Sequence, residues 1–247
     1  MISVFDRLVA ALRSASRVSV LTGAGVSAES GIATFRGAGG LWEGHRIEEV
    51  ATPEAFAEDP ERVWRFYEMR RRNARDARPN PGHEALAAME GRFSEFLLAT
   101  QNVDGLHRRA GSRNLVELHG SIARRYCVQC RRTEEDLEPL EMLPPVCPGC
   151  GGMQRPDIVW FGEPLPVAGW ADAQDAARSA EVYLVVGTSA EVYPAAGLAL
   201  VAADAGAAVF EINPAETALS PVFAGAIREP SGVALPRVVD ALGGRTA

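Results

Sequence analysis

A glycine-rich turn directly after a short apolar run constrains the fold of this chain more than any other feature. Residues 18–21 read Val-Ser-Val-Leu, and Gly23, Gly25 and Ala28 follow in the spacing G-x-G-x-x-A. After a β-branched strand, this spacing is the fingerprint of dinucleotide-binding α/β folds, where glycines let backbone N–H groups approach a pyrophosphate. Isolated matches are often ordinary strand-to-helix turns, so the turn needs support from the rest of the chain.

The residues beyond the turn do not continue as they would in a hydride-transferring domain. Such a domain passes through a helix into a second strand that has an acidic residue near its end. Residues 34–42 instead read TFRGAGGLW, which is rich in glycine and has no strand pattern. The sequence therefore favours NAD as the ligand and argues against a dehydrogenase reaction.

Further short apolar segments predict buried strands at 96–100, 115–118, 182–187 and 207–212. Helical patterns precede the first strand and recur at 82–90, 171–180 and 194–205. This alternation predicts an α/β fold with a large, Rossmann-like, doubly wound parallel sheet. Ligands of such sheets bind beyond the carboxyl ends of the strands, and the polar clusters of this chain fall at those ends.

Two segments interrupt the α/β alternation. Residues 42–80 are helical in pattern and charged, and their Arg-rich run 70–78 is interpreted as a solvated helix face. Residues 124–157 contain all four cysteines and several prolines. We predict a Rossmann-like domain of residues 1–41, 81–123 and 158–247, and a smaller domain formed by the helical insertion 42–80 and the zinc-ribbon insertion 124–157.

The four cysteines form two C-x-x-C pairs, Cys127 with Cys130 and Cys147 with Cys150, separated by 16 residues. Four thiolates on two tight turns supply the tetrahedral sulfur set of a structural zinc site. Four protein ligands close the coordination shell, so the metal is expected to hold the fold and take no part in chemistry. Disulfides or a redox dithiol are the alternative, and a cytoplasmic location disfavours them.

The charge balance and the N-terminal segment bound the partners and the location. The net charge of −7 argues against nucleic acid as the main partner. The first 17 residues carry Asp6 within a helical pattern and lack the apolar core of a signal peptide, and no apolar run approaches the roughly 18 residues that span a membrane. We expect a cytoplasmic protein without membrane contact; a monomer is compatible with the sequence, which leaves the oligomeric state open.

Polar residues at two strand ends indicate a catalytic site. The strand at 96–100 runs into Gln101, Asn102 and Asp104, whose amide and carboxylate groups can hold a carboxamide and a ribose. His119 closes the next strand, and an imidazole has a pKa suited to general-base work near neutral pH. His83 and His107 stand near helix starts, where a supporting role is the simpler interpretation.

Seven motifs in this order resemble the sirtuin family of NAD-dependent protein-lysine deacylases. They are GAGVSAESGIATFR, TQNVDGLH, LHGS before the first C-x-x-C, the second C-x-x-C, IVWFGE, VGTS and INP. The resemblance covers about residues 17–240. It implies NAD consumed as a co-substrate, one structural Zn²⁺ and acylated-lysine proteins as partners.

The resemblance also implies a role for each matching residue. Catalysis would rest on His119, Asn102 and Asp104, and Gln101 would help to hold the ribose and the carboxamide. Substrate backbone would pair with Val159, Trp160, Phe161, Gly162 and Glu163 by strand addition. The remaining contacts to NAD would come from Gly23, Ala24, Gly25, Ser27, Phe35, Arg36, Gly187, Thr188, Ser189, Asn213 and, beside the adenine, Ser231.

The implied reaction moves an acyl group from lysine to ADP-ribose. Nicotinamide leaves, the acyl oxygen attacks C1′ of the ribose to form an O-alkylamidate, and His119 deprotonates the ribose hydroxyl that attacks it. Consumption of NAD accounts for the missing hydride-transfer pattern after the glycine turn. Two residues depart from the family pattern: Ala33 replaces a common Pro, and Glu191 places a carboxylate near a phosphate site and leaves the affinity for NAD open.

The acyl group is indicated by Tyr67 and Arg70, which share one face of a helix at i and i+3. A phenol beside a guanidinium forms a site for a small carboxylate. The pair resembles the Tyr-x-x-Arg signature of class III sirtuins, which remove succinyl, malonyl and glutaryl groups. The alternative is a surface arginine on a solvated helix. The small Ala28 is compatible with room for a longer acyl group.

Two other functions use the same motifs. Mono-ADP-ribosyl transfer or NAD hydrolysis needs the NAD site without lysine deacylation, and turnover of an acyl peptide separates it from the deacylase. A zinc-ribbon module that senses NAD would bind NAD without releasing nicotinamide, and it would leave His119, Asn102 and Asp104 without a task.

Overall fold

A computed structural model describes residues 2–34, 41, 42 and 44–243 of the chain. Its largest element is a six-stranded sheet in the order β11-β10-β9-β1-β4-β5, in which every neighbouring pair is parallel. This confirms the predicted doubly wound, Rossmann-like sheet. The strands are β1 (Arg17–Thr22), β4 (Glu95–Thr100), β5 (Leu115–Glu117), β9 (Val182–Val186), β10 (Ala208–Ile212) and β11 (Gly225–Ile227).

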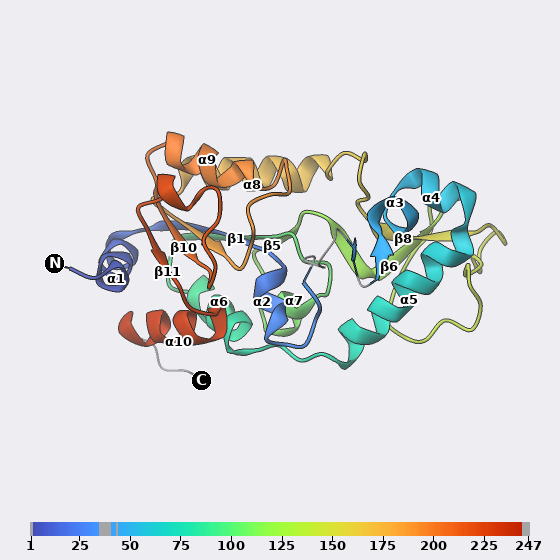
Figure 1. Cartoon of the computed structure of the whole chain (residues 1–247), viewed down its shortest axis with the longest axis horizontal. Coiled ribbons are helices and arrows are strands. Elements are labelled where there is room, and N and C mark those ends of the chain that lie inside the picture. The colour runs from blue at the N-terminus through green and yellow to red at the C-terminus, as the bar shows by residue number, and fades with distance from the viewer. Residues whose placement is uncertain (1, 35–40, 43, 244–247) are drawn as a thin grey trace.

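Helices cover both faces of this sheet, which explains why its central strands are mostly apolar. Val18 and Val20 of β1 face a core that includes α1 (Val4–Ser14), α6 (Pro81–Glu90) and α10 (Ser231–Ala241). Leu21 faces the opposite core, which includes α8 (Val167–Ser179) and α9 (Gly197–Asp204). Figure 1 shows α8 and α9 on one side of the sheet and α6 and α10 on the other.

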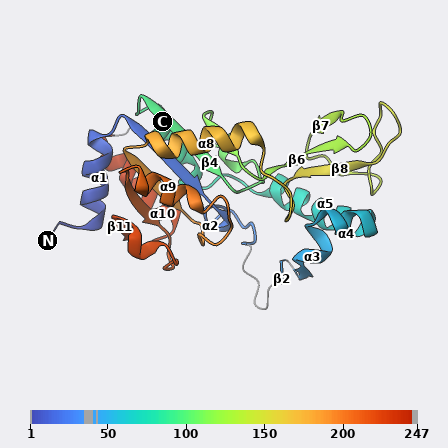
Figure 2. The ribbon, with the colours of Figure 1, turned by 90° about the horizontal axis from the view of Figure 1, so that it is seen from above.

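A second, antiparallel sheet has the order β7-β6-β8 and consists of β6 (Gly120–Cys127), β7 (Thr133–Glu135) and β8 (Gln154–Ile158). It lies beside α3 (Ile47–Val50), α4 (Pro53–Glu58) and α5 (Pro60–Asp76), at the end of the molecule remote from α1 (Figures 1 and 2). The indole N–H of Trp64 on α5 donates to the carbonyl of Gln154 on β8 at 2.8 Å. Strand β6 crosses the predicted boundary at residue 123, and the division into two domains stays a prediction.

The remaining elements are short. They are α2 (Ala24–Ala28), α7 (Leu106–Arg109), the hairpin strands β2 (Leu41–Trp42) and β3 (His45–Arg46), and a 3₁₀ turn at Ser220–Val222.

The Arg-rich run on α5 is only partly the solvated face that the sequence suggested. Arg72 is 60% exposed, but the side chain of Arg71 is 1% exposed. Arg71 forms ion pairs with Glu68 at 3.1 Å and with Asp136 at 3.0 Å, and it donates to the carbonyl of Ile122 at 3.1 Å. A buried charge needs such partners, so Arg71 fastens α5 to the antiparallel sheet.

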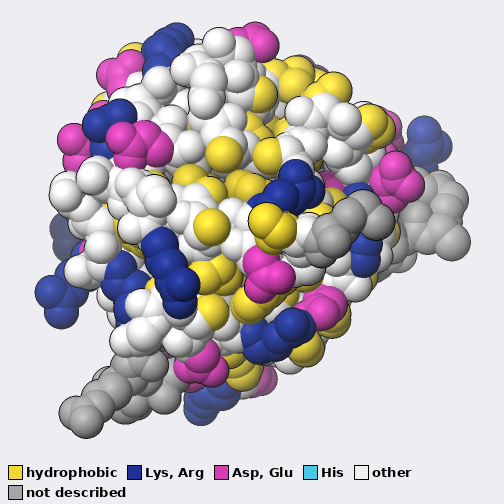
Figure 3. Space-filling model, turned by 90° about the vertical axis from the view of Figure 1, so that its left-hand side faces the viewer, with side chains coloured by type: hydrophobic (Ala, Val, Ile, Leu, Met, Phe, Trp, Pro, Cys, Tyr) yellow, Lys and Arg dark blue, Asp and Glu magenta, His cyan; other side chains and the backbone are white. Residues whose placement is uncertain are grey.

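The surface at the end that carries α1 and α10 mixes both signs of charge. Figure 3 shows Arg and Asp/Glu side chains interspersed there among apolar ones, without a continuous basic stripe on this face. Within the described residues, no helix combines the length and apolarity needed to cross a bilayer.

Two buried histidines lie side by side near the carboxyl ends of β1 and β4. The rings of His83 and His107 are 4.7 Å apart between centroids. His83 accepts from the backbone N–H of Asn80 and completes the capping box of α6, which confirms its supporting role. Nε2 of His107 lies 3.0 Å from Oγ1 of Thr22, whose own hydroxyl donates to Thr100. Nε2 of His107 is therefore the donor to Thr22.

We expect His107 to make the fold sensitive to acid. Burial, reinforced by His83, lowers the pKa of His107 to about 3, whereas the unfolded histidine titrates near 6.5. Below pH 6.5 the unfolded chain binds a proton that the folded chain excludes, so stability falls as the pH is lowered. For this one group the loss between pH 7 and pH 5 is about 2 kcal/mol. Urea unfolding of the wild type and of His107→Gln at both pH values measures it.

The His107→Gln chain is expected to lose less stability than the wild type over this interval. Burial also lowers the pKa of His83, which keeps part of the pH dependence in both proteins. An identical pH dependence in both would contradict a neutral, buried His107.

Candidate active site

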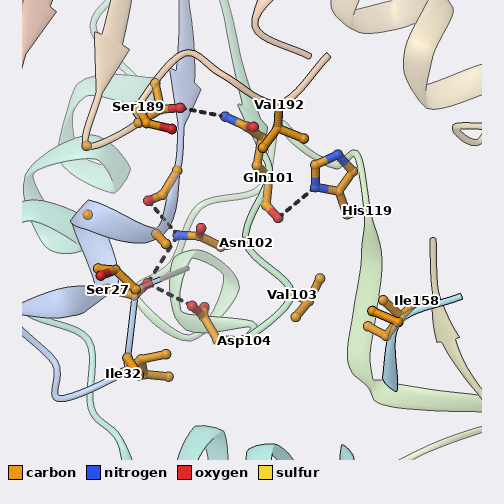
Figure 4. Close-up of a pocket in the computed structure, with 18 of the residues that line it drawn as sticks. Ser27, Ile32, Gln101, Asn102, Val103, Asp104, His119, Ile158, Ser189 and Val192 are labelled. Carbon is orange, nitrogen blue, oxygen red and sulfur yellow. Dashed lines mark hydrogen bonds between the residues drawn. The ribbon is translucent and has the colours of Figure 1, made fainter. Parts of the chain in front are cut away.

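A cavity of about 490 Å³ opens at the carboxyl ends of β1, β4, β9 and β10. The sheet topology predicts this position. Later strands lie on both sides of β1, with β4 on one side and β9 on the other, and ligands of such sheets bind at this switch in strand order. Its wall combines the glycine turn, residues 101–104, His119 and the segments that follow β8, β9 and β10. Figure 4 shows Ser27, Asn102 and Asp104 close together and His119 beyond Gln101.

The glycines of the turn allow two loops to pack together, in addition to any contact that they make with a ligand. The N–H of Gly25 donates to the carbonyl of Gly187 at 2.7 Å, and the N–H of Gly23 donates to that of Val186. A Cβ on Gly25 would lie 2.7 Å from this same carbonyl oxygen, closer than real Cβ contacts come. These two N–H groups are therefore occupied within the protein, and the glycines allow the loops after β1 and β9 to touch.

Asn102, Asp104 and Ser27 form a hydrogen-bonded group at the inner wall. The amide nitrogen of Asn102 donates to the carbonyl of Gly23 at 3.0 Å and to Oγ of Ser27 at 3.1 Å. The Ser27 hydroxyl donates to Asp104 at 2.7 Å, and Asp104 also accepts from the N–H of Leu106. With its nitrogen anchored, Asn102 presents its carbonyl oxygen as the group left to accept from a ligand.

His119 is held in the state that a general base needs. Its Nδ1 lies 3.1 Å from the carbonyl oxygen of Gln101, so Nδ1 carries the hydrogen and Nε2 keeps its lone pair (Figure 4). Burial lowers the pKa of His119, and the hydrogen bond to Gln101 partly offsets this. A lowered pKa keeps the ring neutral near pH 7.

Tyr67 and Arg70 of α5 both line the cavity, together with Asn73 and Ala74 one turn further on. Tyr67 is fully buried and accepts a hydrogen bond from the indole N–H of Trp160 at 2.9 Å. Burial raises the pKa of Tyr67 to about 12, which Arg70 partly opposes. The phenol is thus a neutral donor beside a cation, and Arg70 is not the solvated surface arginine of the alternative interpretation.

Residues 159–163 border the cavity as a loop after β8, and most of their N–H groups are already used. The N–H of Val159 donates to His119, and that of Phe161 donates to Ala51. Glu163 accepts from the N–H of Trp160 at 2.9 Å and forms an ion pair with Arg155 at 2.7 Å. Pairing of this loop with a substrate backbone stays a prediction, and the loop would contribute mainly its carbonyl groups.

The structure brings most of the predicted site residues together. The cavity wall contains Gly23, Ala24, Gly25, Ser27, Tyr67, Arg70, Gln101, Asn102, Asp104, His119, Val159, Trp160, Phe161, Gly162, Glu163, Gly187, Thr188, Ser189 and Asn213. Phe35 and Arg36 lie outside the described residues. Ser231 is apart from this wall: it is buried at the start of α10, and its hydroxyl donates to Glu29 at 3.1 Å.

Several wall residues were not foreseen from the sequence. Ile32, Ile122 and Leu165 add apolar surface, and Val192 and Tyr193 extend the wall after β9. Apolar loop residues carry no chemical motif, so only the fold assigns them to the site.

The four cysteines form a separate group that suits a metal ion. Their sulfur atoms all lie within 4.8 Å of one another, and none is in a disulfide. Cys127 and Cys150 are 3.5 Å apart at sulfur, and Cys130 and Cys147 are 3.6 Å apart. These distances exceed a disulfide bond of about 2.05 Å and approach the edge of about 3.8 Å expected for a tetrahedral Zn–S₄ site. The set therefore fits a structural zinc ion.

Removal of the metal is expected to loosen the antiparallel sheet and spare the parallel one. Cys127 ends β6, and the second cysteine pair, Cys147 and Cys150, precedes β8. Without the metal, these two strands lose the ion that links their ends. Trp64, which donates a hydrogen bond to β8, should become more exposed.

Metal analysis should find one zinc per chain. After chelation, Trp fluorescence should shift to the red while far-UV circular dichroism keeps most of its helical signal. Unchanged fluorescence after complete zinc loss would contradict this.

Comparisons with known proteins agree with the geometry. A sequence model of the Sir2 family matches residues 23–194. The chain is 52% identical over 229 residues to NAD-dependent protein deacylase 2 of Pyrobaculum aerophilum, covering 93% of this chain and 92% of that protein. It is 49% identical to NAD-dependent protein deacylase of Aquifex aeolicus, with 91% and 95% of the chains covered.

Solved structures share the whole fold. A Sir2 homologue bound to NAD superposes with a TM-score of 0.91 at 44% identity, over 96% of this chain and 93% of the other. A mutant Sir2 homologue with ADP-ribose gives 0.92 at 43% identity, over 96% of each chain. A mutant Sir2 with a deacetylated p53 peptide and 3′-O-acetyl ADP-ribose gives 0.88 at 31% identity, over 96% and 97%.

Proposed function

The chain belongs to the Sir2 family, and we propose that it removes acidic acyl groups, chiefly succinyl and malonyl, from protein lysines. It is an NAD-dependent protein deacylase that consumes NAD as a co-substrate, acts on protein substrates and holds a structural zinc ion. The acyl preference, the residue roles and the two-domain division are the parts that we propose.

The observation that carries the acyl preference is the placement of Arg70 beside Tyr67 in the cavity wall. The guanidinium carbon of Arg70 lies 5.8 Å from the centroid of the Tyr67 ring and 5.6 Å from that of Phe66. A terminal carboxylate of the acyl group would accept from this cation and from the Tyr67 hydroxyl. An acetyl group has no such carboxylate, so it gains nothing from either residue.

We assign the contacts to NAD to the rest of the cavity wall. Thr188 and Ser189 at the end of β9 would face the diphosphate, and Asn213 at the end of β10 would reach the adenosine ribose. Asn102 and Asp104 would hold the nicotinamide carboxamide, because one presents an amide oxygen and the other a carboxylate. Ser231 is not needed in this assignment, since it is buried against Glu29.

His119 would act once the acyl oxygen has replaced nicotinamide at C1′ of the ribose. Its Nε2 lone pair removes the proton of a ribose hydroxyl as that oxygen attacks the acyl carbon, and the carbonyl of Gln101 stabilises the positive charge that develops on the ring. The bond between the acyl carbon and the lysine nitrogen then breaks, and one water molecule supplies the second oxygen of the acyl group and the protons of the released amine, while the former amide oxygen stays on C1′. The products are free lysine, nicotinamide and O-acyl-ADP-ribose.

The experiment that tests this function compares one peptide sequence carrying acetyl-, malonyl- or succinyl-lysine, with and without NAD, by mass spectrometry. The 247-residue sequence contains no lysine, so acyl-lysine of the enzyme itself cannot contribute to the signal. We expect NAD-dependent loss of the acyl group, with succinyl and malonyl peptides ahead of the acetyl peptide. Equal or preferential deacetylation would refute the acidic-acyl preference. Nicotinamide release without loss of any acyl group would favour ADP-ribosyl transfer or NAD hydrolysis.

A further inference from the structure

Glu191 is an acidic residue at the mouth of the cavity that the reaction above does not use. It is exposed and lies in the wall, between Ser189 and Val192, which Figure 4 labels at the edge near Gln101. Within the described part of the chain, its carboxylate has no hydrogen bond or ion pair. An unpaired carboxylate at the entrance is free to meet a charge on an incoming substrate.

The other acidic residues of the described wall are already engaged. Asp104 accepts from Ser27 and from the backbone of Leu106. Glu163 is paired with Arg155 at 2.7 Å. Glu191 is therefore the acidic group of this wall that remains available to a partner.

Glu191 lies on the exposed part of the loop that follows β9. Residues 187–189 are buried or half-buried where Gly187 meets Gly25, whereas Glu191 and Tyr193 are exposed. Between them Ala190, which is 4% exposed, has a φ of 57°, a left-handed conformation that is uncommon outside glycine. The chain thus bends at Ala190, between the buried residues 187–188 and the exposed Glu191 at the rim of the wall.

Hydrogen bonds fix this rim relative to the proposed base. Oγ1 of Thr188 accepts from the N–H of Ala190 at 3.2 Å and from the side-chain amide of Gln101 at 3.0 Å. The carbonyl of Gln101 in turn accepts from His119. The turn that carries Glu191 is therefore connected to the reaction centre through Thr188 and Gln101, which preorganises its position.

We propose that Glu191 selects substrates with a cationic side chain, Arg or unmodified Lys, within two residues of the acylated lysine. This proposal rests on the proposed deacylase function but not on the acyl preference. The charges of the site would then be complementary to such a segment: Arg70 inside for the acyl carboxylate, and Glu191 outside for the flanking cation. Because Glu191 is exposed, the effect is modest and screened by salt.

The test uses acetyl and succinyl peptides with Arg, Gln or Glu at each position within two residues of the acyl-lysine. For the wild type at low ionic strength, we expect kcat/KM for the best Arg peptide to exceed that of the matching Glu peptide by roughly three- to tenfold. The ratio should decline toward one in about 0.5 M salt. Glu191→Gln should reduce the ratio below about twofold, and Glu191→Arg should invert it.

Glu135→Gln is the matched control, because Glu135 is an exposed carboxylate on β7 and does not line the cavity. This variant should keep the wild-type ratio. If the ratio persists in Glu191→Gln, or if this variant instead lowers KM for NAD equally with all peptides, the proposal is wrong and the carboxylate acts elsewhere. If turnover is normal but independent of flanking charge, the selection is refuted while the deacylase stands. Absence of any acyl-peptide turnover would overturn both.

Discussion

His119→Ala is expected to lower the rate of O-acyl-ADP-ribose formation by about 10² to 10⁴, the usual contribution of a positioned general base. In the structure Nδ1 of His119 is committed to the carbonyl of Gln101, and Nε2 is the atom left to take a proton. Rapid-quench mass spectrometry of a single turnover measures the product directly. The structural control is His45→Ala, since His45 is half-buried on β3 and is not part of the cavity wall.

The step at which His119→Ala fails distinguishes a base from a structural residue. The proposed base acts after nicotinamide has left, so exchange of labelled nicotinamide into NAD, driven by an acyl peptide, should survive better than product formation. Loss of both to the same extent would instead indicate a damaged site. In the wild type, the acid limb of kcat/KM should have its midpoint below 6.5, because burial lowers the pKa of His119 and protonation removes the lone pair.

The sheet could be predicted because its strands are buried on both faces. A segment such as Val182–Val186 must be apolar at every position, and this run is visible without knowledge of the fold. The same topology predicted that Gln101, Asn102 and Asp104 would meet the glycine turn, because parallel strands end at one edge. The cysteine group was equally readable, since its spacing reflects the coordination geometry of one ion.

Elements that depend on tertiary contacts escaped the sequence analysis. Strand β11 is three residues long and reads Gly-Ala-Ile, so its small side chains give no strand pattern. Helix α10 contains Pro236, which removes a hydrogen bond and argues locally against a helix. Its buried residues Leu235 and Val238 pack in the same core as α6, and this contact outweighs the local cost.

The environments of charged and polar side chains could not be predicted from the local sequence either. Arg71 and Arg72 are neighbours of identical chemistry, yet one is buried and the other exposed. What separates them is Asp136, which lies 65 positions further along the chain and pairs with Arg71 but not with Arg72. Likewise Ser231, which the family resemblance placed beside the adenine, is buried at the start of α10 and donates to Glu29, 202 positions away in the chain. Partners distant in sequence decide the role of a polar side chain, and a local pattern does not contain them.

Arg70→Met is expected to abolish most desuccinylation and to leave deacetylation within about threefold of the wild type. Methionine keeps the length and apolar packing of the side chain against Phe66 and Tyr67 but removes the cation. The acyl carboxylate would then enter the cavity with only the Tyr67 hydroxyl to meet it. Losing one partner of such a charged pair costs about 2–3 kcal/mol, or roughly 30- to 150-fold in kcat/KM for the succinyl peptide.

The matched control for this prediction is Arg72→Met, two residues away on α5. Its side chain is 60% exposed and its ion pair with Glu68 is long, at 3.5 Å, so the change should affect both substrates by less than twofold. The decisive quantity is the ratio of succinyl to acetyl kcat/KM for each variant. If Arg70→Met lowers both activities equally, Arg70 supports the cavity wall without reading the acyl group. A selective loss, absent in Arg72→Met, assigns the acyl carboxylate to Arg70.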